Sequence, residues 1–183
     1  MCVGKWHLGD QPEFLPTRHG FDHYFGLPYS TDMGPAAEGA RSSLGEPLPD
    51  PAKIQRDHPP LPWLRDEKVI ERVRADEQTT LVSRYTDEAV EFLRESRDKP
   101  FFLYLAHSAV HFPLYPGKAF QGKSKNGVYG DWVEEVDWSV GQVLDAVRAL
   151  GLSKDTLVIF TSDNGGTPRA VNKPLRGFKG STW

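Results

Sequence analysis

The amino-acid sequence predicts an α/β fold in which helices flank a mostly parallel sheet. The first observation is a continuous apolar run at residues 101–106, FFLYLA, which has the length of a strand covered on both faces. The second is a similar run at residues 156–162, TLVIFTS. The third is that a segment with helical periodicity precedes each run, an alternation typical of a parallel sheet.

The composition suits one globular domain and excludes several classes of function. The 183 residues carry 22 Lys and Arg against 25 Asp and Glu, a formal net charge of −3, which argues against a polybasic surface for nucleic acid or membranes. The longest apolar run has six residues, whereas a transmembrane helix needs about 20. Cys2 is the only cysteine, so no disulfide can form within the chain.

The first 64 residues are predicted to contain little regular structure. Residues 1–36 are rich in Gly, Pro, His and aromatic side chains and lack a sustained period of 3.6 or 2, as in loops that carry sites. Residues 37–64 look like an insertion or a long connection, because six of the 15 prolines fall there. Proline lacks the amide hydrogen and is rejected from helix interiors.

Two helices are predicted from apolar positions spaced three and four residues apart. The first begins around Asp76 and ends before Lys99, since Pro100 biases the preceding residue away from helical backbone. The second runs from Trp132 to Leu150, where Gly151 is well placed to stop it. The apolar face of the first helix holds Leu81, Val82, Tyr85, Ala89, Phe92 and Leu93.

Polar side chains follow both predicted strands, where ligands gather in open α/β sheets. Asp163 and Asn164 come directly after residues 156–162. Their oxygens suit Ca²⁺ or Mg²⁺, although the tetrapeptide DNGG by itself favours a turn. His107 and His111 follow residues 101–106 and can serve as a general acid or base, although a loop histidine bonded to a carbonyl is the commoner case.

Cationic residues gather near both ends of the chain. Lys5 and His7 lie two residues apart, so an extended backbone would point them to the same side, where they could hold an anion. Between residues 163 and 183, a single carboxylate faces four cations, namely Arg169, Lys173, Arg176 and Lys179. A positive field suits a sulfate or phosphate substrate, and a solvated basic loop explains it as well.

Five motifs, in order, resemble the type I sulfatases of the alkaline-phosphatase-like superfamily, particularly the arylsulfatase group. They are GKWHLG, HGFDHYFGLPYS, PFFLYLAHSAVHFP, VIFTSDNGG and LRGFKGSTW. The resemblance implies that residues 1–183 are a partial catalytic domain of alkaline-phosphatase-like fold, with a proline-rich connection at about 37–75. It also implies hydrolysis of a sulfate ester, on a small molecule or a sulfated glycan.

The resemblance implies roles for three residues of the first 111. Lys5 matches a lysine that contacts the sulfate, and His7 matches a histidine that hydrogen-bonds the catalytic formylglycine hydrate. His111 matches a histidine beside the leaving oxygen, which it would help to protonate. His107 is the weaker candidate of the two histidines in that loop.

The remaining matches concern the sulfate and a metal. Lys179 matches a second sulfate-binding lysine and is preferred to Lys173 because Gly-Ser-Thr-Trp follows it. Ser30 matches a serine near the sulfate in some arylsulfatases. Asp163 and Asn164 match two ligands of a divalent metal, usually Ca²⁺, with Mg²⁺ as the other candidate. The resemblance therefore favours a metal site over a simple turn.

The nucleophile of this family is missing from the sequence. Type I sulfatases convert the Cys or Ser of a C-x-P-x-R motif into formylglycine, and the residues after Cys2 do not fit that motif. The family's paired aspartates are also absent. We therefore expect an internal fragment, inactive alone, of an enzyme whose formylglycine lies upstream and is made by a formylglycine-generating or other sulfatase-maturing enzyme. The family suggests a periplasmic, secreted or lysosomal location.

Two other functions stay open. Phosphatases, phosphodiesterases and phosphonate hydrolases belong to the same superfamily, and a Thr or Ser nucleophile would favour them. A non-catalytic remnant could instead bind sulfated glycans through Lys5, His7, His111 and Lys179. A chance match of an unrelated α/β domain would require five coincidences. None of these functions involves nucleic acid or a membrane span.

Overall fold

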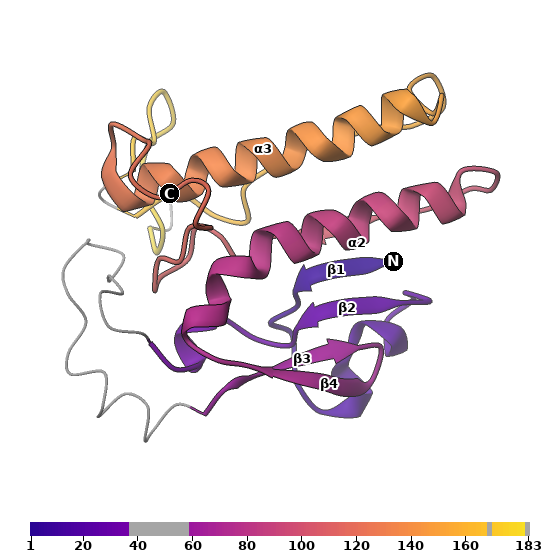
Figure 1. The fold of residues 1–183 in the computed structure, drawn as a ribbon, viewed down its shortest axis with the longest axis horizontal. Coiled ribbons are helices and arrows are strands. Elements are labelled where there is room, and N and C mark those ends of the chain that lie inside the picture. Colours follow the sequence, from indigo (N-terminus) through magenta and orange to yellow (C-terminus); the bar gives the residue numbers. More distant parts are fainter. Residues whose placement is uncertain (37–58, 168–169, 182–183) are drawn as a thin grey trace. The chain divides into compact units, whose positions relative to one another are not determined.

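The computed structural model describes residues 1–36, 59–167 and 170–181 of the chain (Figure 1). The chain divides into two compact units, Met1–Ser153 and Lys154–Trp183. The first unit holds a sheet and two long helices. The described residues of the second unit form turns and irregular segments, with neither helix nor strand.

A five-stranded sheet forms one layer of the first unit. Its strands are β1 (Cys2–Lys5), β2 (Tyr24–Leu27), β3 (Leu61–Arg65), β4 (Lys68–Val73) and β5 (Tyr104–Ala106), in the order β4-β3-β2-β1-β5. Strand β1 pairs in parallel with β2 and with β5, whereas β3 pairs antiparallel with β2 and β4. The predicted α/β class is confirmed, with a mixed sheet whose parallel part is β2-β1-β5.

Helix α2 (Leu81–Ser96) lies against the sheet, and helix α3 (Gly127–Ala149) lies on the other side of α2 (Figure 1). Tyr85 of α2 belongs to the same buried cluster as Val3 and Trp63 of the sheet. Val82 of α2 instead packs with Trp132 of α3. Helix α2 is therefore the middle of three layers, which explains why apolar side chains cover so much of its circumference.

Both predicted helices are confirmed, with small differences at their ends. The 3-10 helix η4 (Asp76–Thr80) leads into α2, and α3 begins at Gly127, before the predicted Trp132. Gly151 has a φ of +73°, and its amide donates to the Arg148 carbonyl at 3.0 Å, so it ends α3 as predicted. Among the described residues, no helix combines the length and apolar character needed to cross a membrane. The other 3-10 helices are η1 (Pro12–Phe14), η2 (Pro16–Arg18) and η3 (Thr31–Met33).

Strands β1 and β2 and most of β3 lie within residues 1–64, where the sequence predicted little regular structure, so that prediction was wrong. Strands β1 and β2 have only four residues each and contain Gly4 and Gly26, which leaves too few side chains to show an alternating pattern. The hairpin of β3 and β4 lies in the proline-rich connection, and β3 includes Pro62. The rest of that connection, residues 37–58, lies outside the described residues.

The predicted buried strand at residues 156–162 does not form, and this prediction is corrected. Leu157 is 85% exposed and Phe160 is 76% exposed. A strand requires the backbone of a neighbouring strand, and the described residues of Lys154–Trp183 offer none. Apolar composition alone therefore did not make this segment a strand.

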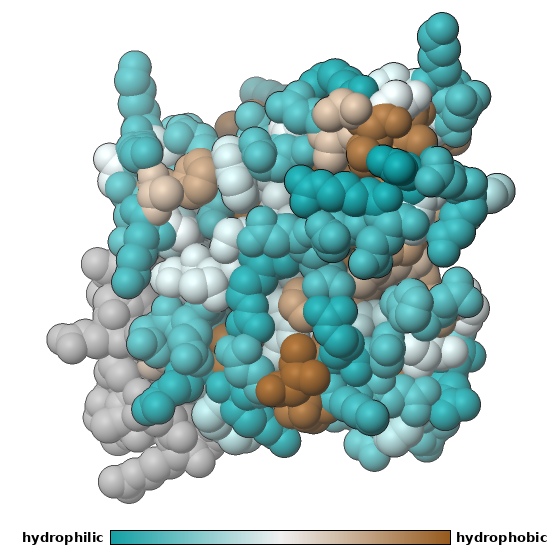
Figure 2. All heavy atoms as spheres, turned by 45° about the vertical axis from the view of Figure 1, so that its right-hand side comes forward, coloured by the Kyte–Doolittle hydropathy of each residue, from teal (hydrophilic) through white to brown (hydrophobic). Residues whose placement is uncertain are grey.

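Strand β5 is shorter and more exposed than the sequence predicted. It is the last strand in the sheet order and pairs with β1. The exposure of its side chains shows that it is not covered on both faces, contrary to the prediction from the sequence. Leu105 packs on the core, whereas Phe102 is 67% exposed and Tyr104 is 45% exposed. Exposed apolar side chains form separate patches on a mostly hydrophilic surface in the face that Figure 2 draws.

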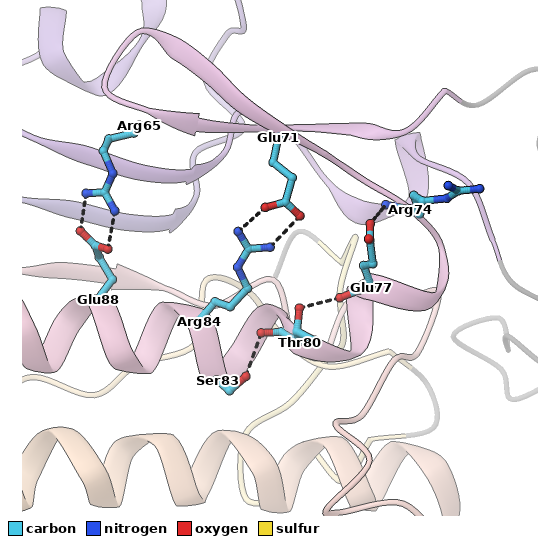
Figure 3. Close-up of polar contacts among 8 residues, drawn as sticks. All are labelled: Arg65, Glu71, Arg74, Glu77, Thr80, Ser83, Arg84 and Glu88. Atoms are coloured by element: carbon cyan, nitrogen blue, oxygen red, sulfur yellow. Dashed lines mark hydrogen bonds and ion pairs between the residues drawn. The ribbon is translucent and has the colours of Figure 1, made fainter.

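Two arginine–glutamate pairs join the β3-β4 hairpin to α2 (Figure 3). Arg84 of α2 donates to both carboxylate oxygens of Glu71, at 3.0 and 2.7 Å, and its guanidinium lies 3.7 Å from the Trp63 ring centroid. Arg65 makes the same two-point contact with Glu88, at 2.7 Å for each bond. Planar two-point contacts fix the orientation of the hairpin more than they add stability, because the pairs are partly exposed.

Acidic side chains on α3 organise the loop that precedes it. Asp131 accepts hydrogen bonds from the backbone amides of residues 122, 123 and 124, at 2.7 to 3.0 Å. One turn later, Glu135 accepts a hydrogen bond from the Gly117 amide at 2.7 Å. Glu135 is only 2% exposed, and its burial raises the pKa of the carboxyl to about 7 against the opposing effect of that amide.

Replacing Gly4 with alanine is expected to destabilise the protein by roughly 2–5 kcal/mol, because the added methyl would collide with the Ala106 carbonyl at a φ of +113°. Gly141→Ala is the matched control, since no atom outside its own helix lies within 4 Å of the added carbon. That change should stabilise α3 by roughly 0.5–1 kcal/mol. Urea unfolding midpoints measure both, and equal stability of the two variants would contradict the close approach.

Glu135→Gln is expected to flatten part of the dependence of stability on pH. The folded pKa of Glu135 lies above its ordinary 4.5, so folded protein retains a proton that the unfolded chain releases, and stability falls as the pH rises from 4.5 through about 7. The variant should therefore gain stability relative to wild type between about pH 5 and pH 8. The exposed neighbour Glu134, changed to Gln, is the control. Parallel urea midpoints for wild type and Glu135→Gln across this range would refute the prediction.

Candidate active site

Three parallel strands end at the same edge of the sheet and bring predicted site residues together there. Lys5, the last residue of β1, lies in register with Leu27, the last residue of β2. Gly4 lies in register with Ala106, the last residue of β5. The segments that follow these strands contain His7, Ser30 and His111, so their side chains start from neighbouring backbone positions.

The segment after β1 turns over the end of β2. The amide of Trp6 donates to the Leu27 carbonyl at 3.0 Å, and the amide of His7 donates to the Pro28 carbonyl at 2.9 Å. His7 is exposed and has a φ of +59°, so the extended backbone that would align it with Lys5 is not present. A left-handed backbone at a residue other than glycine costs about 1 kcal/mol or more, and such residues cluster at functional sites.

Ser30 and His111, which the sequence assigned to the same site, lie side by side. The Ser30 side chain is buried, and its Oγ lies 3.2 Å from Nδ1 of His111. The same Nδ1 lies 2.9 Å from the backbone carbonyl of Phe112, and the imidazole stacks on the Phe112 ring at 4.7 Å. A carbonyl can only accept, so Nδ1 must donate, and Nε2 is the nitrogen that can exchange a proton while this bond stays intact.

Asp32 lies with Ser30 and His111 in one cluster at the strand ends, although no sequence motif marks it. Its Oδ1 lies 3.9 Å from Nδ1 of His111 and has no hydrogen-bond partner among the described residues. Asp32 lies in η3, directly after Ser30 and Thr31. The spacing Ser-x-Asp after a strand is the one sequence feature that could have indicated Asp32. A role for Asp32 at the site depends on its contact with His111, which the sequence alone does not reveal.

His107 lies between the two helices rather than with His111. Its Nε2 lies 3.1 Å from Oγ of Ser139 in α3, and that hydroxyl lies 2.5 Å from Oγ1 of Thr86 in α2. Burial lowers the pKa of His107 to about 4, so the imidazole is neutral at neutral pH. Next to it, Ser108 Oγ lies 3.2 Å from the buried Tyr85 hydroxyl. These contacts fasten the loop that carries His111.

Cys2 cannot serve as a nucleophile in this structure. It is fully buried in β1, and burial raises the pKa of its thiol to about 12, against the opposing charge of the N-terminus. The thiolate is the reactive form, so Cys2 is inert at neutral pH.

The second unit holds the predicted metal ligands next to the predicted lysine. Nδ2 of Asn164 donates to Oδ1 of Asp163 at 2.6 Å, and both residues are exposed. The amide of Lys179 donates to the Gly166 carbonyl at 2.9 Å, whereas Lys173 is exposed elsewhere in the loop.

The oxygens of Asp163 and Asn164 are of the type that Ca²⁺ and Mg²⁺ prefer. Within the part of the chain that the structure describes, no group of three or more His, Cys, Asp or Glu side chains could hold a metal. The pair therefore fits part of a coordination shell.

Known proteins similar to this chain share one description. The family model for sulfatases matches residues 1–183. The chain is 40% identical over 177 residues to the N-acetylgalactosamine-6-sulfatase of Mus musculus, covering 96% of this chain and 32% of that protein. It is 34% identical over 201 residues to arylsulfatase A of Homo sapiens, covering 99% of this chain and 37% of that protein. It thus spans about a third of the length of these relatives.

Solved structures agree with these sequence relatives. Ps i-CgsB, crystallised in complex with k-i-k-neocarrahexaose, superposes with a TM-score of 0.71 at 30% identity, covering 98% of this chain and 41% of that one. The PsFucS1 sulfatase from Pseudoalteromonas sp. superposes with a TM-score of 0.74 at 27% identity, covering 90% of this chain and 35% of that one.

Acid is expected to weaken the wild-type protein more than the His107→Gln variant. Because burial places the folded pKa of His107 at about 4 and its ordinary value is 6.5, the unfolded chain binds this proton first, and stability is lost as the pH falls from 6.5 through 4. Urea midpoints at about pH 7 and pH 5 measure this loss of stability. The variants are compared with wild type at each pH, because Glu135 changes stability in the opposite direction in all of them. His23→Gln, at a side chain 65% exposed, is the control. An identical loss in wild type and His107→Gln would disprove the effect.

Proposed function

This chain belongs to the sulfatase family, as its five motifs predicted, and from that premise we propose that it supplies part of the active site of an enzyme that hydrolyses sulfate esters. The observation that carries the proposal is the cluster at the ends of β1, β2 and β5. There, Ser30 and Asp32 lie against His111 with its Nδ1 held as a donor. Such a histidine is suited to acid–base chemistry at Nε2.

The proposed chemistry divides among the residues that end or follow β1, β2 and β5. Lys5 offsets the negative charge of the bound sulfate, and Ser30 hydrogen-bonds a sulfate oxygen. His7 hydrogen-bonds the nucleophilic group and takes its proton. His111 gives the proton at Nε2 to the oxygen that leaves with the alcohol or phenol, and its Nδ1 stays bonded to the Phe112 carbonyl.

Asp163 and Asn164 would hold a divalent cation, with Ca²⁺ or Mg²⁺ fitting their oxygens. When bound, that cation polarises the sulfate, and a formylglycine, made by a sulfatase-maturing enzyme, supplies the nucleophilic oxygen. Lys179 contributes a second positive charge toward the sulfate. We place the nucleophile outside these 183 residues, because the sequence has no C-x-P-x-R motif, Cys2 is buried, and the relatives are about three times as long.

A sulfated sugar is the substrate class we favour. The relative with 40% identity is named an N-acetylgalactosamine-6-sulfatase, and a solved neighbour was crystallised with a neocarrahexaose. Arylsulfatase A, at 34% identity, keeps an aryl sulfate as the second candidate. The relatives at 40% and 34% identity are both named sulfatases, which favours sulfate transfer over phosphoryl transfer. Acid–base residues at the strand ends have no purpose in simple glycan binding.

Lys5→Ala in the full-length enzyme is expected to lower kcat/KM for sulfate esters by about 10²–10³-fold, because one fixed charge that stabilises the sulfate is lost. Lys68→Ala is the matched control, since Lys68 is exposed in β4 at the far end of the sheet order from β1. Initial rates with 4-nitrophenyl sulfate and with a 6-sulfated galactosamine measure both variants. An unchanged kcat/KM in Lys5→Ala would remove Lys5 from the site.

The 183-residue chain by itself serves as the companion experiment. Without a formylglycine it should release no sulfate from either substrate, even with Ca²⁺ present. Turnover by the purified chain would contradict the placement of the nucleophile outside it, while an inactive full-length, formylglycine-bearing protein would overturn the proposed function itself.

A further inference from the structure

We propose that Asp32 is a positioning residue for His111, holding its imidazole in the charged form that delivers a proton to the leaving oxygen. The inference rests on the proposed function, in which His111 acts as the general acid. Asp32 is not among the residues that the sequence motifs assigned, and it enters only through its contact with the imidazole.

The carboxylate of Asp32 is aimed at the imidazole by local structure. The 3-10 helix η3 follows β2, and the amide of Met33 donates to the Ser30 carbonyl at 3.1 Å, which turns Asp32 back toward the strand end. The side chain as a whole is 32% exposed, but its Oδ1 is shielded from solvent and lies 3.9 Å from Nδ1 of His111. One oxygen faces the histidine and the rest of the side chain faces outward.

That shielded oxygen has no hydrogen-bond partner among the described residues. A buried carboxylate oxygen without a donor is costly, and the cost is relieved when a positive charge lies beside it. His111 in its imidazolium form is a cation at ion-pair distance. The orphaned oxygen therefore favours the protonated state of His111.

The Phe112 carbonyl and Asp32 together decide which nitrogen reacts. Because the carbonyl at 2.9 Å only accepts, Nδ1 keeps its hydrogen in both charge states. The proton that leaves is therefore the one on Nε2. Ser30 Oγ at 3.2 Å is neutral and can orient the ring without favouring its charge.

The proposed step balances as follows. The nucleophile's oxygen forms its bond to sulfur as the bond from sulfur to the alcohol oxygen breaks, and the electron pair of the broken bond stays on that oxygen. The Nε2 proton of His111 moves to the same oxygen, which leaves as a neutral alcohol. His111 is then neutral, and Asp32 remains a carboxylate that favours uptake of the next proton from water.

Leaving groups of different acidity test this role in the full-length, formylglycine-bearing enzyme. A sugar alcohol needs the proton, whereas 4-nitrophenolate leaves readily without it. Asp32→Asn should lower kcat for a 6-sulfated galactosamine by about 30–100-fold and for 4-nitrophenyl sulfate by less than about 3-fold, since general acid catalysis contributes about 10²-fold or more. Asp32→Glu, which keeps the charge, should recover part of the loss, and Asp98→Asn, at a side chain 87% exposed, should change neither rate.

A kcat loss of the same size for both substrates would show a merely structural role and overturn the proposal, as would no loss for either. Wild-type enzyme that hydrolyses neither substrate would instead overturn the proposed function. In that case the Asp32 contact is decided separately, by nitrogen-15 spectra of the imidazoles in the same protein.

In those spectra, His111 should lose its charge at a lower pH in Asp32→Asn than in wild type. The other titratable groups nearby, Lys5 and His7 at the strand ends and His107 between the helices, are common to both proteins. An unchanged His111 titration would overturn the pairing. If Asp32→Asn does not fold, Asp32→Ser carries the same comparison.

Discussion

The close approach of three parallel strands is the constraint from which the first unit follows. The carbonyls of Ala106 and Gly4 occupy the places where side chains at Gly4 and Gly26 would begin, so β5, β1 and β2 pair at this distance only with glycine at both positions. Parallel pairing then sets the carboxyl ends of all three strands at one edge of the sheet. The short segments after them therefore begin side by side.

Convergence of the backbone would not by itself make a site, because the loop after β5 must also be held in one conformation. At the start of this loop, His107 hydrogen-bonds to a side chain of α3 and Ser108 hydrogen-bonds to a side chain of α2. Both helices therefore hold the loop in place. His111, a few residues further along, keeps its side chain 21% exposed. Two histidines of one loop thus have different surroundings, because His107 contacts the helices and His111 lies beside Ser30 after β2.

The sequence predicted the elements whose side chains show a regular apolar pattern. It did not predict the strands that depend on close contacts between backbones. Helices α2 and α3 show long apolar faces, which made them predictable. Strands β1 and β2 depend on Gly4 and Gly26, which lack the side chain that would collide with the neighbouring strand. The spacing of apolar residues in the sequence does not reveal this requirement. Sequence motifs identified Ser30 and His111 as candidate site residues. Asp32 became a candidate only because its Oδ1 lies 3.9 Å from Nδ1 of His111 in the folded protein. The segment 156–162 has the composition of a strand, but pairing needs a partner that composition does not specify.

The proposed function divides into an acid–base half in the first unit and a metal half in the second unit, and different local structure holds each of them. The acid–base half is anchored by β1, which is paired on both sides within the first unit. The metal half follows residues whose apolar side chains are exposed, including Leu157 and Phe160, and whose backbone makes no strand pairing among the described residues. The residues after β1, β2 and β5 are therefore held by strand pairing, whereas Asp163 and Asn164 lie in an irregular segment where their own side chains hydrogen-bond to each other.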